Sequence, residues 1–201
     1  MRTRLRQPQQ MYFQLQIELA KLAQLPMIVR CRNAYDDIIP ILGWEHEHIP
    51  NGGIILGFDG SDDQARRLQR MDFKIGISGC SLKTKEQREV VRTIPHQSLI
   101  LMSDSPNCEI NITDFGTSRF LKTTFSSEPK SQWTPGKRVS GRNEPGNIIQ
   151  VLEVAAALKN ISLDYIAYLS NKSCKEIFFS KYKSYHDHIK RKNSDGSTEL
   201  Q

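Results

Sequence analysis

The chain of 201 residues carries a formal net charge of +6, and 38% of its residues are hydrophobic while 25% are charged. This length suits a single hydrophobic core, and the composition is that of an ordinary globular protein. No apolar run approaches the ~18 residues that a membrane-spanning helix needs, so we expect a soluble protein with no membrane partner. The basic charge predicts attraction to polyanions such as nucleic acids at low salt.

The amino terminus predicts no secretory leader or transit peptide. The basic segment 1–10 is followed by no apolar stretch and no small-residue cleavage site, and it lacks the serines of a transit peptide. We therefore expect a cytoplasmic or nuclear protein.

The cysteines predict buried thiols in a reducing compartment. None of them has CxxC spacing, which argues against a zinc ribbon or a disulfide scaffold. They are Cys31, Cys80, Cys108 and Cys174.

Helices and short apolar strands alternate along the first half of the chain. Apolar residues recur at helical spacing over 11–24, and Pro26 ends that pattern ahead of an extended run at 27–29. The alternation then continues with helices predicted over 35–42, 62–71 and 84–92 and strands over 53–58, 73–78 and 98–102. Such alternation predicts an α/β fold with a parallel sheet, because each helix returns the chain to the same end of the sheet.

Periodicity lapses after Pro106 and returns only at Ile148. A loop of that length in a compact domain is usually functional or mobile. Helices are predicted over 148–158, 163–169 and 172–179, and the remainder is polar and basic. We therefore divide the chain into a folded domain over 1–180 and a basic polar tail over 181–201, which we expect to be disordered.

Function in parallel α/β proteins concentrates at the carboxyl ends of the strands, where the following loops converge. Five segments at or near such ends, in this order, resemble the TatD family of magnesium-dependent deoxyribonucleases, and specifically its eukaryotic branch. They are LPMIVRCRNA, GGIILGFDGS, KIGISGCSLKT, LMSDSP and GRNEPGNIIQVLE, within a similarity that runs from Tyr12 to about Phe179.

The resemblance implies a partial TIM-type (β/α)8 barrel of the metal-dependent hydrolase superfamily. The family's first strands are missing, because its His-x-His pair and its Glu-x-Gly-Leu-Asp motif would lie before Met1. It also implies DNA as the partner and a divalent metal, Mg²⁺ or Mn²⁺, as the cofactor.

The family's metal ligands are largely replaced in this sequence. The family pattern places histidines where Arg30 and Leu56 stand, whereas its aspartate ligand is kept as Asp104 and an acidic position two residues earlier is Met102. Two-metal hydrolysis of a phosphodiester needs several carboxylates and neutral imidazoles. Leucine offers no lone pair and arginine is a permanent cation, so we predict a degenerate site with Asp104 as the surviving ligand and no catalytic residue that we can assign.

Two other polar features have open interpretations. Arg30 and Arg32 alternate along a strand end and so share a face, which favours phosphate binding; alternatively, Arg32 pairs with a carboxylate such as Asp104 or Glu144. Glu144, in the Arg-Asn-Glu-Pro motif, is either an orienting group at the mouth of the site or an ordinary helix-dipole partner.

Two histidine pairs, in 46–48 and 186–188, have spacing that suits metal, but both lie in predicted polar loops that would not preorganise ligands.

Three functional hypotheses follow. The first is a TatD-like deoxyribonuclease by descent whose hydrolytic chemistry is lost or severely weakened. The second is a non-catalytic module that binds nucleic acid or a protein. The third is a truncated barrel with open strand edges, which would need a dimer or a partner chain to cover them.

Overall fold

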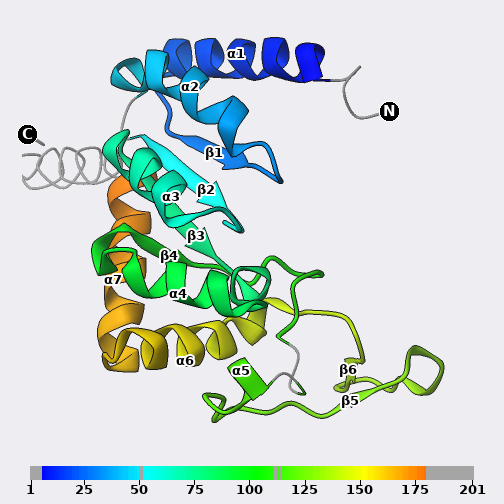
Figure 1. Ribbon diagram of the computed structural model, residues 1–201. Helices are drawn as coiled ribbons and strands as arrows, with labels where there is room; N and C mark the ends of the chain where they lie inside the picture. Colours follow the sequence, from blue (N-terminus) through cyan, green and yellow to red (C-terminus); the bar gives the residue numbers. More distant parts are fainter. Residues whose placement is uncertain (1–5, 50–51, 111–112, 114, 180–201) are drawn as a thin grey trace, which may run out of the picture.

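The computed structural model describes residues 6–49, 52–110, 113 and 115–179 (Figure 1). The predicted disordered tail and the histidine pair at 186–188 lie outside these ranges. No helix within them is long and apolar enough to cross a membrane.

A parallel sheet of four strands, in the order β1-β2-β3-β4, forms the centre of the fold. This arrangement confirms the predicted α/β fold and the predicted parallel pairing. The strands are β1 (Met27–Arg30), β2 (Gly53–Leu56), β3 (Phe73–Ile77) and β4 (Leu99–Leu101).

Helices precede, connect and follow the strands. The α-helices are α1 (Arg6–Ala23), α2 (Tyr35–Glu45), α3 (Asp62–Arg70), α4 (Lys85–Thr93), α5 (Phe115–Ser118), α6 (Ile148–Lys159) and α7 (Leu163–Phe178). The short 3-10 helices are η2 (His46–His48), η3 (Gly79–Leu82), η4 (His96–Ser98), η5 (Lys130–Gln132) and η6 (Pro145–Asn147). A second, two-stranded sheet pairs β5 (Ser127–Glu128) with β6 (Arg138–Val139).

Local signals in the sequence explain where the connecting helices begin. A capping box of Thr84 and Gln87 starts α4, as predicted, and an equivalent box of Ser61 and Gln64 starts α3. In each box the hydroxyl accepts a backbone N–H of the first turn, so a donor that the helix leaves unpaired is satisfied.

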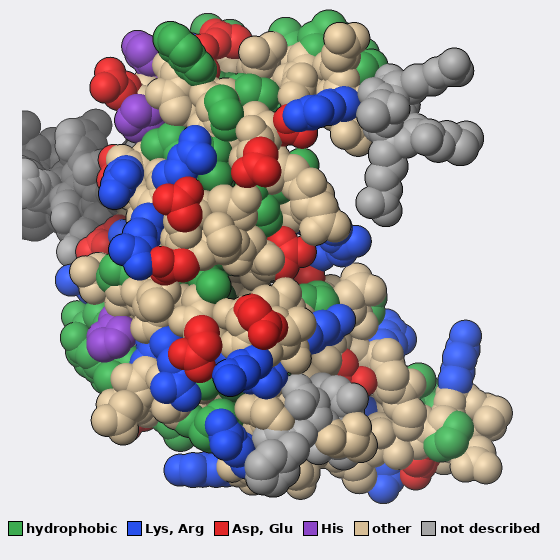
Figure 2. Space-filling view, viewed as in Figure 1, with side chains coloured by type: hydrophobic (Ala, Val, Ile, Leu, Met, Phe, Trp, Pro, Cys, Tyr) green, Lys and Arg blue, Asp and Glu red, His purple; other side chains and the backbone are tan. Residues whose placement is uncertain are grey.

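The main core lies between one face of the sheet and the helices that cover it. Ile55, Ile75 and Leu99 are register partners on three neighbouring strands and are fully buried on this face. Val154 of α6 packs into the same cluster. Figure 2 shows acidic and basic side chains interspersed over the outer surface of α3 and α4, so this helical face carries no single-sign patch.

The opposite face of the sheet packs against α7. Ile54 and Ile100 form a second cluster with Ile177 of this helix. The Leu101 N–H donates to the Ser170 hydroxyl at 3.0 Å, and the Ser173 hydroxyl donates to a carbonyl of η4 at 3.1 Å. The helix therefore covers part of the β4 edge, where the sequence predicted an open one.

The β1 edge, by contrast, has no further strand beside it within the described ranges, and Ile28 there is 60% exposed.

Candidate active site

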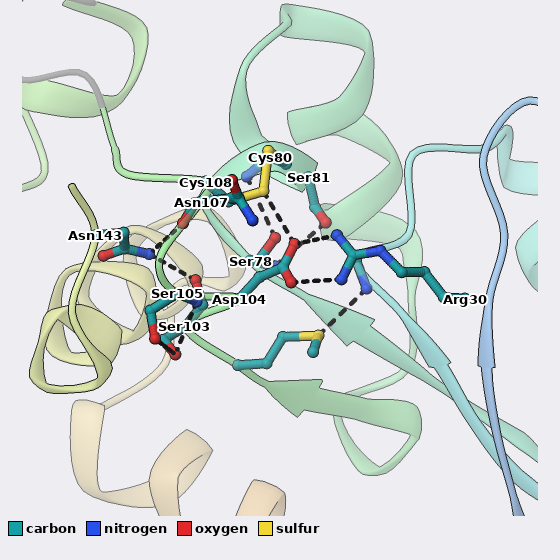
Figure 3. Close-up of a disulfide and its surroundings, with 12 residues drawn as sticks. Arg30, Ser78, Cys80, Ser81, Ser103, Asp104, Ser105, Asn107, Cys108 and Asn143 are labelled. Carbon is teal, nitrogen blue, oxygen red and sulfur yellow. Dashed lines mark hydrogen bonds and ion pairs between the residues drawn. A yellow bond between two sulfur atoms is a disulfide. The ribbon is translucent and has the colours of Figure 1, made fainter. Parts of the chain in front are cut away.

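The two positions where the family pattern has histidine lie side by side. Arg30 ends β1 and Leu56 ends β2, and the two residues are register partners in the parallel ladder. Register partners in neighbouring strands project from the same face of a sheet. Asp104 follows β4, and its carboxylate faces the Arg30 guanidinium (Figure 3).

Arg30 forms a bidentate ion pair with Asp104. The two terminal guanidinium nitrogens of Arg30 donate to Oδ1 and Oδ2 of Asp104 at 2.6 and 2.7 Å. The Asp104 side chain is only 9% exposed and that of Arg30 is 40% exposed. The hydrogen bond to Asp104 raises the pKa of Arg30 above its ordinary value, so the guanidinium stays charged at any accessible pH. Both oxygens of the surviving carboxylate are thus engaged by a fixed cation.

Asn143 holds the segment that carries Asp104. Its buried amide nitrogen donates to the carbonyl oxygens of Ser103 and Asn107, each at 2.7 Å. The loop before η6 therefore fixes both sides of Asp104, which itself has a left-handed backbone at φ 54°. The Arg-Asn-Glu-Pro motif pointed to this loop, although its predicted functional residue was Glu144 and not Asn143.

The same segment is cross-linked to the loop after β3. Cys80 and Cys108 form a disulfide with a Cα–Cα distance of 4.8 Å, and Cys108 Sγ lies 3.1 Å from Asp104 Oδ2. A Cβ atom at Gly79 would lie 2.0 Å from the Cys108 carbonyl oxygen, so glycine permits this close approach. The prediction of reduced thiols is wrong for these two cysteines, because the pairing joins loops that meet only in the folded chain.

The other two cysteines are free thiols, as predicted. Cys31 is buried, and burial raises the pKa of its thiol to about 11. Cys174, on α7, is partly exposed.

The two carboxylates suggested as partners of Arg32 pair with other arginines. Arg30 pairs with Asp104, and the Glu144 carboxylate lies 3.7 Å from Nε of Arg138. Arg32 is exposed and has no salt bridge within the described part of the chain. Arg32 therefore pairs with neither Asp104 nor Glu144, and that alternative is wrong for these two carboxylates.

Arg30 and Arg32 do line one cavity, of about 650 Å³, between α1, β1 and α2. Their role in phosphate binding stays a prediction. Glu144 sits directly before η6, whose first residue is Pro145, and its side chain makes no capping hydrogen bond. Its role as an orienting group likewise stays a prediction.

The described side chains do not fit a two-metal centre. Within the described ranges, no three His, Cys, Asp or Glu residues come together as a group that could hold a metal ion. Two positions before the aspartate, Met102 Sδ accepts the Gly57 N–H at 3.2 Å, so its side chain serves a local contact. The histidines of 46–48 lie in the short helix η2, which continues α2, and not in a loop.

Comparison with known proteins identifies the family. The family model described as "TatD related DNase" matches residues 1–179. The chain is 41% identical to Deoxyribonuclease Tat-D of Schizosaccharomyces pombe over 79% of its own length and 51% of that protein. It is 31% identical to an uncharacterized metal-dependent hydrolase of Bacillus subtilis over 83% of its length and 56% of that protein.

Solved structures of related proteins share this fold. A TatD family hydrolase from Entamoeba histolytica superposes with a TM-score of 0.75 at 27% identity, covering 84% of this chain and 55% of that one. An uncharacterized amidohydrolase from Saccharomyces cerevisiae superposes with a TM-score of 0.72 at 26% identity, covering 85% and 59%.

The chain spans about half the length of the curated relatives it matches. Its four parallel strands and their helices are accordingly part of a TIM-type (β/α)8 barrel. The Bacillus subtilis relative is named a metal-dependent hydrolase, which supports a divalent metal in the family at large. The family match over 1–179, the sequence identity and the shared fold together show that this chain belongs to the TatD family of deoxyribonucleases.

Proposed function

We propose that this chain is a TatD-type deoxyribonuclease by descent that binds DNA but hydrolyses its phosphodiester bonds weakly or not at all. The Arg30–Asp104 ion pair carries the proposal. A Mg²⁺ or Mn²⁺ ion at Asp104 would have to displace a guanidinium bound through both carboxylate oxygens, and the neighbouring Leu56 offers no donor atom in exchange.

DNA remains the proposed partner because of the family and the charge. The names of the relatives specify DNA, and this chain carries a net charge of +6. Arg32 is the better phosphate ligand of the predicted pair, since the guanidinium of Arg30 is already engaged. The nucleus or the cytoplasm is the compartment that we propose for such a protein.

A nuclease assay tests the loss of chemistry. The purified chain would be incubated with single-stranded and double-stranded oligonucleotides in Mg²⁺ or Mn²⁺, beside Asp104→Ala as a matched blank. We expect salt-sensitive DNA binding and the same background cleavage for both proteins. Metal-dependent turnover that Asp104→Ala abolishes would overturn the proposal.

Restoring the family histidines tests the cause. In the variant Arg30→His with Leu56→His, two imidazoles would stand side by side next to a released Asp104 carboxylate. We expect this variant to bind Mn²⁺ at least 10-fold more tightly than the natural chain, measured by the loss of the free-ion electron paramagnetic resonance signal. Tight Mn²⁺ binding by the natural chain, lost in Asp104→Ala, would show that Arg30 does not block the site.

We further propose that a second copy of the chain covers the β1 edge. Ile28 on β1 is exposed, and α1 carries exposed apolar residues at helical spacing that include Leu15 and Leu19, each more than half exposed. Because α1 and β1 line one cavity, they are adjacent, and apolar surface exposed on adjacent elements favours an interface. Light scattering should show a dimer that Leu19→Lys dissociates; a monomer at high micromolar concentration would contradict the proposal, and a complex only with other chains would assign the surface to a partner.

A further inference from the structure

A second hollow lies beside the Arg30–Asp104 pair. It is a cleft of about 720 Å³ between the Asp104 segment, which contributes Ser105 and Pro106, and the β5–β6 segment (127–142), which contributes Lys130, Trp133, Lys137 and Arg142. Figure 1 shows the β5–β6 segment projecting away from the main sheet, on the side toward which the strands point. Because Ser105 and Pro106 follow β4 closely in the chain, the cleft lies near the carboxyl end of that strand.

Trp133 presents an aromatic surface to this cleft. Its side chain is 47% exposed, while its indole N–H donates to the carbonyl oxygen of Lys137. That hydrogen bond orients the ring without covering it. A flat aromatic ring held at the wall of a cleft is a suitable platform for stacking.

The charge around Trp133 is positive. Lys130 and Arg142 have no salt bridge within the described part of the chain, and Lys137 lies 3.9 Å from its nearest carboxylate oxygen, on Glu128. Glu144, which also lines the cleft, faces Arg138, whose guanidinium stacks on the Phe125 ring. Among the described residues that line the cleft, the one carboxylate, Glu144, is thus paired, whereas the cations Lys130 and Arg142 are not.

We propose that this cleft binds single-stranded DNA, with one base stacked on Trp133 and the adjoining phosphates on Lys130, Lys137 and Arg142. The proposal rests on DNA being the ligand of this chain, as argued above, and it adds the strand form and the contact site. A base inside a duplex has both faces covered by its neighbours, so an aromatic platform selects unpaired strands. The cleft would bring such a strand to the Asp104 segment.

The chain provides its own spectroscopic control, because it has two tryptophans. The second, Trp44, is on α2, is 84% exposed and lines none of this cleft. In Trp44→Phe the fluorescence reports on Trp133, and in Trp133→Phe it reports on Trp44. Each variant would be titrated with a 12-residue oligothymidine and with its duplex, while anisotropy of a labelled strand measures binding independently.

We expect the oligothymidine to quench Trp133 and to leave Trp44 unchanged. Trp133→Ala should weaken single-strand binding roughly 10-fold or more, since stacking supplies much of such affinity. Lys130→Gln should weaken binding and flatten its salt dependence, whereas Lys172→Gln, at an exposed position of α7, should do neither. Circular dichroism melting of each variant separates lost binding from lost folding.

The failures are distinguishable. DNA binding that leaves Trp133 unquenched and survives Trp133→Ala would overturn the cleft and leave the proposed function standing. Equal affinity for the duplex would overturn the preference for single strands. No DNA binding by the natural chain would overturn both, and turnover in the nuclease assay would affect the proposed function alone.

Discussion

The carboxylate of Glu153 accepts hydrogen bonds from both the hydroxyl and the backbone N–H of Thr123, at 2.6 and 3.1 Å. It also accepts a hydrogen bond from the N–H of Lys122 at 2.9 Å. Glu153 lies on α6 and is 5% exposed. The long connection after β4 is therefore attached to the main core ahead of the β5–β6 segment. Gln150, one turn earlier on α6, strengthens the attachment by donating to the Thr123 carbonyl.

Replacing Glu153 by alanine should destabilise the protein by about 2–3 kcal/mol, because three donors lose a charged acceptor in a place that water reaches poorly. Urea unfolding followed by circular dichroism measures the change. Glu176→Ala is the matched control, since that residue is on α7 and its side chain is 59% exposed. We expect it to cost less than about 0.5 kcal/mol; similar losses for both variants would contradict the anchoring role.

The Arg30–Asp104 pair should behave as one unit in a double-mutant cycle. Arg30→Met leaves a nearly buried carboxylate unpaired, so we expect a loss of about 1–3 kcal/mol, reduced by the partial exposure of Arg30. Arg30→Met combined with Asp104→Leu should be more stable than the sum of the single changes predicts, by about 1 kcal/mol or more. Additive losses in urea unfolding would show that the pair contributes little.

Lys159 should make stability rise with pH in the alkaline range. Its amine donates to the carbonyls of Arg92 and Ile94 at the carboxyl end of α4, and burial lowers its pKa from 10.5 to about 8. Between these values the unfolded chain binds more protons than the folded one, so the free energy of unfolding increases as the pH rises.

The measurement is the difference between the natural chain and Lys159→Met at pH 7.5 and 10. Cys31 titrates with the opposite sign, because burial raises its pKa from 9.0 to about 11, and the difference removes that contribution. We expect the natural chain to gain about 1–2 kcal/mol relative to the variant, since one pKa unit corresponds to about 1.4 kcal/mol and the amine is partly hydrated. A constant difference would show that Lys159 keeps its ordinary pKa.

Ser170→Ala should loosen the β4 edge. The change removes the acceptor of the Leu101 N–H, at a cost of about 1 kcal/mol. Hydrogen exchange at the Leu101 amide should accelerate more than exchange at β2 amides, which bond to other strands. Unchanged exchange would mean that α7 covers this edge through packing alone.

The sequence predicted the sheet well because its signals are local. Strand alternation, Pro26 and the Thr84 capping box each act within a few residues, and the structure confirms all of them. The prediction of two separate helices over 163–169 and 172–179 was wrong, because the structure has one continuous helix, α7, and local signals could not show this. Ser170 interrupts the apolar pattern, yet it is buried against β4, where its hydroxyl has a partner that the sequence alone does not show.

The site is built from contacts between residues far apart in the chain, and the sequence could not show which of the possible partners meet. It identified Asp104 and the two changed histidine positions through the family resemblance. Arg30 and Arg32 share a face, so periodicity could not decide which one reaches a carboxylate that lies 74 residues away from Arg30. The disulfide was missed because Cys80 and Cys108 are 28 residues apart and have no spacing signature.

That disulfide also constrains the chain when it is not folded. The bond between Cys80 and Cys108 encloses α4, β4 and Asp104 in a covalent ring. A ring of this size removes conformational entropy from the denatured ensemble worth roughly 3–4 kcal/mol in the chain-entropy description. Oxidised and reduced protein would thus start refolding from different ensembles, and the oxidised one would already hold the Asp104 segment, beside the proposed DNA-binding cleft, close to its native neighbour.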